Sequence, residues 1–185
     1  MFYYQDKLAW EKKQQQMEDL MLEFRTLFDE PRGLPPSRVT YHSITLIASA
    51  TPVNIRPFKL AHYLKEEAEK QLADMLESGI IHHSNSPYAS PIILVKKDSG
   101  WCLCVVVYRA LNKLTVLDRF PIPIIEELLD ELHGANIFSK LDLKSGFYQV
   151  WVREKDVIKT AFRTHEGHYE FLVMPFGLMN APTSF

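Results

Sequence analysis

The pattern of apolar positions along the chain predicts three helices, with strands before and after the third. Between residues 7 and 30, apolar side chains recur every three or four positions among Glu, Lys and Gln, which predicts an amphipathic helix. The same spacing returns at 64–78, where Gly79 stands in a C-terminal capping position. It returns again after Pro121-Ile-Pro123, where two glutamates suit a first helical turn. We expect the first helix to dock on a core, with a partner-binding helix as the alternative.

Runs of β-branched and aromatic residues predict the strands. These runs lie at 91–95, 101–108, 137–142, 158–164 and 168–173. Residues 96–100 and 164–167 have the polar and glycine composition of hairpin connections, and 38–60 is typical of extended chain. A cluster of proline and glycine at 31–36 separates the first helix from the rest. The fold class is therefore α+β, with an N-terminal helix and linker at 1–36 and one domain at 37–185.

Composition and charge narrow the function classes. The 185 residues carry a net charge of −2, so no general basic field attracts nucleic acid. Residues 96–119 form a local group of five cations against two aspartates.

Cys102 and Cys104 are too close in sequence for a strain-free disulfide, and we interpret them as free thiols. The histidines show no zinc-ligand spacing and indicate structural or surface roles. Without an apolar run of membrane-spanning length or a signal peptide, we expect a soluble, intracellular protein of the cytoplasm or nucleus, with no membrane partner.

The stretch 137–150 carries the strongest chemical signal. A strand-like run delivers one carboxylate, Asp142, and then turns through Lys144-Ser-Gly146 into an aromatic pair. An aspartate after a strand commonly caps a turn. A carboxylate beside backbone amides also suits a hard cation that holds phosphate oxygens. Two-metal phosphoryl chemistry requires further carboxylates, and the sequence offers no obvious second one.

Six strings stand together in order and spacing, and they carry a family resemblance. They are Ser86-Pro-Tyr-Ala-Ser-Pro-Ile-Ile-Leu-Val-Lys-Lys97, Tyr108-Arg-Ala-Leu-Asn-Lys113, Phe120-Pro-Ile-Pro123, Phe138-Ser-Lys-Leu-Asp-Leu-Lys-Ser-Gly146, Lys159-Thr-Ala-Phe-Arg-Thr164 and Met174-Pro-Phe-Gly-Leu-Met-Asn-Ala-Pro182. Over about 24–185 the chain closely resembles the reverse transcriptase of Ty3/gypsy-type LTR retrotransposon Pol polyproteins. The resemblance implies part of a right-hand polymerase fold, the fingers and the first half of the palm.

The resemblance also implies roles for individual residues. Asp142 matches the first catalytic aspartate, which binds Mg²⁺ or Mn²⁺, and Lys96 matches the fingers lysine that contacts the incoming triphosphate. Phe147 matches the aromatic under the deoxyribose that excludes a 2′-hydroxyl. Phe176 and Gly177 match part of the nucleotide pocket. The implied partners are an RNA or DNA template-primer, a dNTP and the remaining polymerase segments where these are supplied separately.

The chain departs from the family pattern at three points. The Tyr-x-Asp-Asp sequence, which would follow Phe185, is absent. Cys102 stands where the family has a fingers arginine. Val105-Val-Val107 holds one extra residue, which forces a bulge or a register change. We therefore expect a reverse transcriptase fragment that lacks catalysis on its own. The alternatives are a noncatalytic nucleic-acid or protein-binding remnant, and a degenerate product with no selected function.

Overall fold

Two units make up the structure, Met1–Arg32 and Gly33–Phe185. The computed structural model describes residues 2–25, 33–97, 100–120, 124–136, 138, 140 and 142–185, without the side chains of 2–12, 96, 97 and 100–104. In the first unit, α1 (Phe2–Glu23) confirms a helix where the apolar spacing predicts one, although it begins earlier. Residues 26–30 of the predicted helix lie outside the described residues. Within this unit the apolar side chains of Met17, Leu20 and Met21 are exposed, and docking of the helix on a core stays a prediction.

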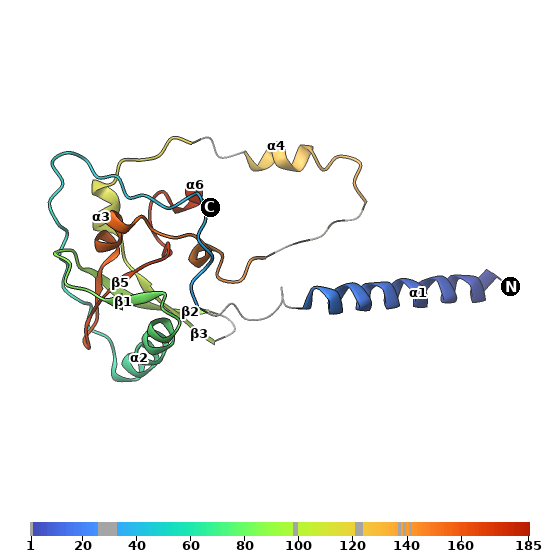
Figure 1. Cartoon of the computed structure of the whole chain (residues 1–185), viewed down its shortest axis with the longest axis horizontal. Coiled ribbons are helices and arrows are strands. Elements are labelled where there is room, and N and C mark those ends of the chain that lie inside the picture. The colour runs from blue at the N-terminus through green and yellow to red at the C-terminus, as the bar shows by residue number, and fades with distance from the viewer. Residues whose placement is uncertain are drawn as a thin grey trace. The chain divides into compact units, whose positions relative to one another are not determined.

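The second unit is built on a five-stranded sheet in the order β1-β5-β4-β2-β3. Figure 1 labels β1, β2, β3 and β5. Its strands are β1 (Ile81–His83), β2 (Ser90–Lys97), β3 (Gly100–Val106), β4 (Phe162–Arg163) and β5 (His168–Phe171). Three pairs are antiparallel, and β2 with β4 is parallel. The mixed α/β content confirms the α+β class.

The β2–β3 hairpin contains a register shift, but not within Val105–Val107, where the extra residue predicts one. Leu94 pairs with Cys104, whereas Val95 pairs with Cys102. Leu103 is therefore the additional residue on β3, a β-bulge that increases the local twist. The bulge precedes the valine run, so residues 105 and 106 pair in regular register with 93 and 92.

Helix α2 (His62–Glu77) confirms the second predicted helix and packs against β3 and β1 of the sheet. Ala68, Leu72 and Met75 are buried on one face, as the apolar spacing predicts. Gly79 ends the helix with φ +73°, and the Ile80 amide donates to the Met75 carbonyl at 3.0 Å. This left-handed capping arrangement leads the chain directly into β1.

An extended segment, residues 33–60, runs over the second unit and forms isolated bridges instead of a continuous strand. His42 bridges to Val152, and Leu46 bridges to Thr115. The Trp151 indole Nε1 donates to the Pro35 carbonyl at 2.9 Å. Extended chain is confirmed here, and its polar backbone groups pair with several different elements.

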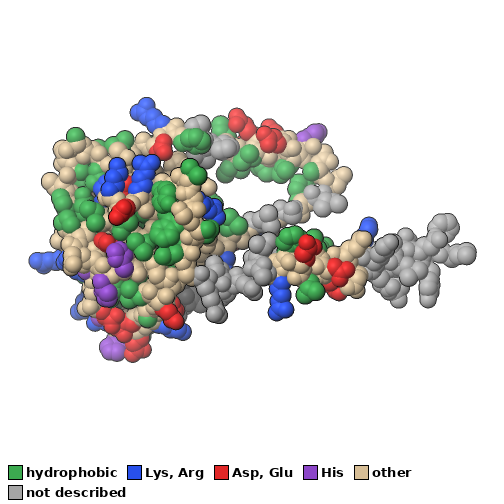
Figure 2. Space-filling model, viewed as in Figure 1, with side chains coloured by type: hydrophobic (Ala, Val, Ile, Leu, Met, Phe, Trp, Pro, Cys, Tyr) green, Lys and Arg blue, Asp and Glu red, His purple; other side chains and the backbone are tan. Residues whose placement is uncertain are grey.

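Several shorter helices complete the unit. They are α3 (Arg109–Leu114), α4 (Ile125–Asp130), α5 (Glu154–Val157), α6 (Ala181–Ser184) and the 3₁₀ turns η2 (Gly146–Gln149) and η3 (Ile158–Thr160). All described residues of 124–136 are exposed, and Figure 2 shows acidic side chains along one side of α4 and hydrophobic ones along the other. Within the described chain, none of these helices, nor α1 or α2, has the length and apolar character to cross a membrane.

The predicted strand at 158–164 is right only in part, and the predicted strand at 137–142 is wrong at its described residues. Residues 158–160 form η3, because the Thr160 hydroxyl donates to the Val157 carbonyl at 2.7 Å and accepts the Phe171 amide at 2.8 Å. Only 162–163 of that run pairs as a strand. In the predicted strand 137–142, residues 138, 140 and 142 are not in a strand, and the others lie outside the described residues. A strand requires a hydrogen-bonded neighbour, and no described segment pairs with this one.

Candidate nucleotide site

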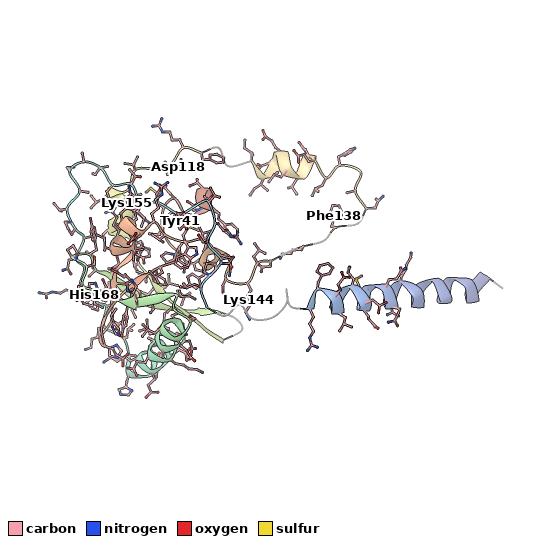
Figure 3. The ribbon with its side chains drawn as sticks, viewed as in Figure 1. Tyr41, Asp118, Phe138, Lys144, Lys155 and His168 are labelled. Carbon is pink, nitrogen blue, oxygen red and sulfur yellow. The ribbon has the colours of Figure 1, made fainter. Side chains whose placement is uncertain are left out.

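The turn after Asp142 sets the geometry of the candidate site. Ser145 adopts a left-handed conformation with φ +53°, the one described non-glycine residue with positive φ. The Tyr148 amide donates to the Ser145 carbonyl at 2.9 Å, which closes η2. Lys144, in the same turn, is labelled in Figure 3. A left-handed serine is a local strain of the kind that persists where the surroundings fix the backbone.

This turn forms one wall of a cavity of about 670 Å³. The cavity is lined by Asp142, Leu143, Lys144, Ser145, Gly146, Phe147, Phe176 and Phe185. The lining combines one carboxylate, one ammonium group and three aromatic rings. Its members come from the 142–147 turn and from the C-terminal part of the chain, which are separated by about thirty residues in the sequence.

Three phenylalanines form one cluster in the cavity. The Phe147 ring meets the Phe176 ring edge-on, with centroids 4.7 Å apart and planes at 86°. Phe147 also meets Phe185 at 5.2 Å and 65°. A Cβ atom on Gly146 would lie 3.0 Å from the Phe185 ring, so a side chain here would press on this ring. The cluster holds Phe147 from two sides and leaves it only partly buried.

The structure brings together most of the residues that the sequence singles out. Asp142, Phe147 and Phe176 share the cavity. Gly177 adjoins it, with φ +89°, in the turn that carries Phe176. The side chain of Lys96 lies outside the described part of the structure, and its backbone belongs to β2. Asp142 reaches the cavity from an exposed turn, and the described residues before it, 138 and 140, are not in a strand.

The chemistry of the lining fits a hard divalent cation in part. Asp142 is the one carboxylate among the described residues that line the cavity. Carboxylate oxygen is a ligand that Mg²⁺ prefers, and Mg²⁺ commonly keeps waters and substrate phosphates as its other ligands. One carboxylate therefore suits the capture of a metal–phosphate complex, whereas a two-metal centre needs more.

Sequence reasoning missed two parts of the site. Phe185 lines the cavity, although its position in a short helical segment gave no sign of contact with Gly146 or Phe147. Asn112, in α3, hydrogen-bonds to the turn that carries Phe176 and Gly177. The string Tyr108-Arg-Ala-Leu-Asn-Lys113 was the available signal for Asn112, but spacing alone gives no contact partner.

Other titratable groups lie away from this cavity. Glu170 is buried, accepts the Ser84 hydroxyl at 2.6 Å and pairs with His82 at 3.1 Å, which ties β5 to β1. The ligand atoms of Glu69, His165 and Glu166 lie within 4.8 Å of one another. His165 is already paired with Glu69 at 2.7 Å, and exposed groups of this kind are common without a metal, so we assign none.

The matching family model and the relatives agree on one class of protein. Residues 95–185 match the family model described as reverse transcriptase (RNA-dependent DNA polymerase). The chain is 38% identical over 175 residues to the retrovirus-related Pol polyprotein from transposon 297 of Drosophila melanogaster. It is 39% identical over 147 residues to the enzymatic polyprotein of cauliflower mosaic virus (strain Strasbourg). These alignments cover 91% and 77% of the chain, which spans 16% and 22% of the two relatives.

A solved structure supports the fold. The foamy viral protease-reverse transcriptase in complex with double-stranded DNA superposes with a TM-score of 0.78 at 22% identity. The match covers 94% of this chain and 31% of that protein. The polymerase architecture expected from the resemblance is confirmed at the level of the fold.

Proposed function

Because the chain belongs to the reverse transcriptase family, we propose that Gly33–Phe185 is the nucleotide-binding segment of an RNA-directed DNA polymerase. The segment corresponds to the fingers and the first half of the palm of a Ty3/gypsy-type enzyme. The observation that supports this most is the meeting of Asp142, Phe147 and Phe176 at one cavity. A carboxylate for a metal and aromatic rings for a sugar are the groups that dNTP binding needs.

Each residue has a distinct proposed role. Asp142 holds Mg²⁺ or Mn²⁺, which when bound neutralises phosphate charge and aligns the triphosphate. Phe147 lies under the deoxyribose, and its fixed ring leaves no space for a 2′-hydroxyl. Phe176 and Gly177 form the adjoining side of the pocket. Lys96 supplies a point charge to the triphosphate.

Chemistry requires more than the described cavity offers. Template-directed addition joins the primer 3′-oxygen to the α-phosphorus of the dNTP and releases pyrophosphate. Asp142 would hold a divalent cation, and a second cation, which would stabilise charge on the leaving oxygen, would need further carboxylate ligands. We therefore propose that these 185 residues bind the nucleotide and that catalysis needs carboxylates from a further polymerase segment.

The nucleic-acid partner is proposed to be an RNA or DNA template-primer. Arg109 and Lys113 are exposed on α3, and Arg119 is exposed a few residues later. Contacts between such cations and phosphates make affinity fall with salt. Binding to an RNA/DNA hybrid is expected to weaken as salt rises, with a shallower slope in Lys113→Ala; a response that is flat in both proteins would exclude this partner.

Equilibrium binding of dATP tests the nucleotide site. The wild-type 185-residue chain is expected to bind dATP in the presence of Mg²⁺, and Asp142→Ala is expected to lose the Mg²⁺-dependent part. Asp130→Ala, which removes an exposed carboxylate of α4, is the matched control and keeps wild-type affinity. Equal Mg²⁺-dependent binding by Asp142→Ala would reject the assignment.

A primer-extension assay tests the proposed need for further carboxylates. The chain alone is expected to give no template-dependent incorporation with Mg²⁺ or Mn²⁺. Incorporation by the wild-type chain that disappears in Asp142→Ala would show that one carboxylate is enough and would overturn this part of the proposal.

A further inference from the structure

The turn that carries Phe176 and Gly177 is held from outside the cavity by a single side chain. The Asn112 Nδ2 donates to the Gly177 carbonyl at 2.8 Å. The Oδ1 atom of the same amide accepts the Met179 backbone N–H at 3.0 Å. Both polar ends of one carboxamide are therefore bonded to the backbone of one turn, two residues apart.

Asn112 is itself held in a fixed place. Its backbone N–H donates to the Tyr108 carbonyl at 2.8 Å within α3. Tyr108 is buried, and its hydroxyl donates to the Thr160 carbonyl at 2.7 Å. Leu111, the neighbour of Asn112, is 1% exposed. Because α3 is anchored in the core at Tyr108 and Leu111, just before Asn112, the carboxamide is a rigid support.

The supported turn is close-fitting and leads directly to the aromatic cluster. A Cβ atom on Gly177 would lie 3.4 Å from the Val106 carbonyl, so the turn lies against the end of β3. Phe176, immediately before it, touches Phe147 edge-on at 4.7 Å. A shift of the turn therefore moves the edge against which Phe147 rests.

We propose that Asn112 is a positioning residue for sugar selection: by holding the Gly177 turn it fixes Phe176, and through Phe176 the Phe147 ring. This inference rests on the proposed function, since it assumes that Phe147 contacts the sugar. Asn112 touches no nucleotide and acts only through the turn. A carboxamide suits the turn because the turn presents one acceptor and one donor. A carboxylate cannot donate at neutral pH, and a hydroxyl would have to make both bonds from one atom, whereas the carboxamide uses two atoms.

The first measurement tests the support without a nucleotide. Hydrogen exchange of the Met179 amide is expected to be slow in the wild type and faster in Asn112→Ala. Asn112→Asp keeps an acceptor for Met179 but puts an oxygen against the Gly177 carbonyl, so the Met179 amide is expected to stay protected. Unchanged exchange in Asn112→Ala would overturn the proposed support.

The second measurement is the ratio of affinities for dATP and ATP in Mg²⁺. This ratio is expected to fall about fivefold or more in Asn112→Ala, the range covered by losing one or two hydrogen bonds. It is also expected to fall in Asn112→Asp, which retains only the Met179 bond. Asn85→Ala, which alters an exposed asparagine elsewhere, is the matched control and keeps the wild-type ratio.

The outcomes separate this inference from the proposed function. If the wild type binds dATP and both Asn112 variants weaken dATP and ATP in equal proportion, Asn112 is merely structural and the inference is overturned. If the wild type binds neither nucleotide, the proposed function fails and the role in sugar selection fails with it. Thermal melting of each variant reports folding independently of both ratios.

Discussion

The rings of Phe147 and Phe176 meet edge to face, with centroids 4.7 Å apart, across 28 intervening residues of sequence. The edge of one ring carries partial positive charge and the face of the other partial negative charge, so this geometry is attractive. Phe176 also meets Tyr148 at 5.9 Å. The contact therefore joins the turn after Asp142 to the C-terminal turn, and it makes two distant segments into one site.

A double-mutant cycle measures this contact. Phe147→Leu and Phe176→Leu are expected to show a coupling of about 0.5–1.5 kcal/mol in the free energy of unfolding, the usual value of an aromatic pair. Urea denaturation of the four proteins checks it. Phe120→Leu is the control, since Phe120 is 66% exposed, and its coupling to Phe147→Leu is expected to be near zero. If the coupling between Phe147 and Phe176 is also zero, the contact does not stabilise the cavity.

The ion pair between Lys159 and Asp156 gives a second prediction. Asp156 is 1% exposed; its Oδ1 meets Lys159 Nζ at 2.5 Å and its Oδ2 accepts the Ile44 amide at 3.1 Å. Lys159→Met leaves a buried carboxylate without its cation, which costs about 3–5 kcal/mol of unfolding free energy. Chemical denaturation measures this loss.

Two further variants show whether the cause is the unpaired charge. Lys155→Met, an exposed lysine of α5, is expected to change the unfolding free energy by about 0.5 kcal/mol or less. Adding Asp156→Asn to Lys159→Met is expected to recover part of the loss, because no buried charge remains. A loss below about 1 kcal/mol in Lys159→Met would contradict the buried-pair explanation.

Sequence patterns predict some elements of the fold and not others. Helix α2 and the β2–β3 hairpin follow from local signals: apolar spacing, a capping Gly79 and a polar loop. The run 158–164 predicts a strand, but its first residues form η3, because the apolar residues there suit either a strand or a helical turn. The Thr160 hydroxyl, which donates to the nearby Val157 carbonyl and accepts the Phe171 amide of β5, stabilises the turn.

In the candidate site, too, some residues follow from local sequence and others depend on contacts between distant segments. Asp142 and Phe147 stand five residues apart, so their proximity follows from the turn chemistry of Lys144-Ser-Gly146. The contributions of Phe185 and Asn112 depend on packing between distant segments, and no local pattern encodes such contacts. Family resemblance identified Phe176 and Gly177, but the hydrogen bonds that hold their turn appear only in the structure.

The start of the folded domain gives a third prediction. The sequence places it at residue 37, whereas Pro35 is buried and its carbonyl accepts the Trp151 indole N–H at 2.9 Å. A chain beginning at 37 loses this bond and the burial of Pro35. Its melting temperature is expected to be several degrees lower than that of a chain beginning at 33, for a loss of about 1–2 kcal/mol. Equal melting temperatures would favour the boundary at 37.

His42 gives the last prediction, a pH dependence of stability. His42 is 1% exposed, and burial lowers its pKa from 6.5 to about 4, while the nearby Asp156 carboxylate opposes this shift. Its Nδ1 is 2.8 Å from the Ser184 hydroxyl, and Lys159 also faces Asp156. Between pH 6.5 and about 4 the unfolded chain binds a proton at this residue that the folded chain does not. The free energy of unfolding therefore falls as pH drops through this window.

Comparing the wild type with His42→Asn isolates this effect. At about 1.4 kcal/mol per pKa unit, the His42 contribution is on the order of 3 kcal/mol across the window. Asparagine keeps a polar atom near the Nδ1 position for Ser184 but does not titrate, so the pH profile of its unfolding free energy is expected to be flatter. His62→Asn, an exposed histidine of α2, is the control and is expected to keep the wild-type slope. Parallel profiles for the wild type and His42→Asn between pH 4 and 6.5 would mean that His42 charges in the folded state as readily as in the unfolded chain.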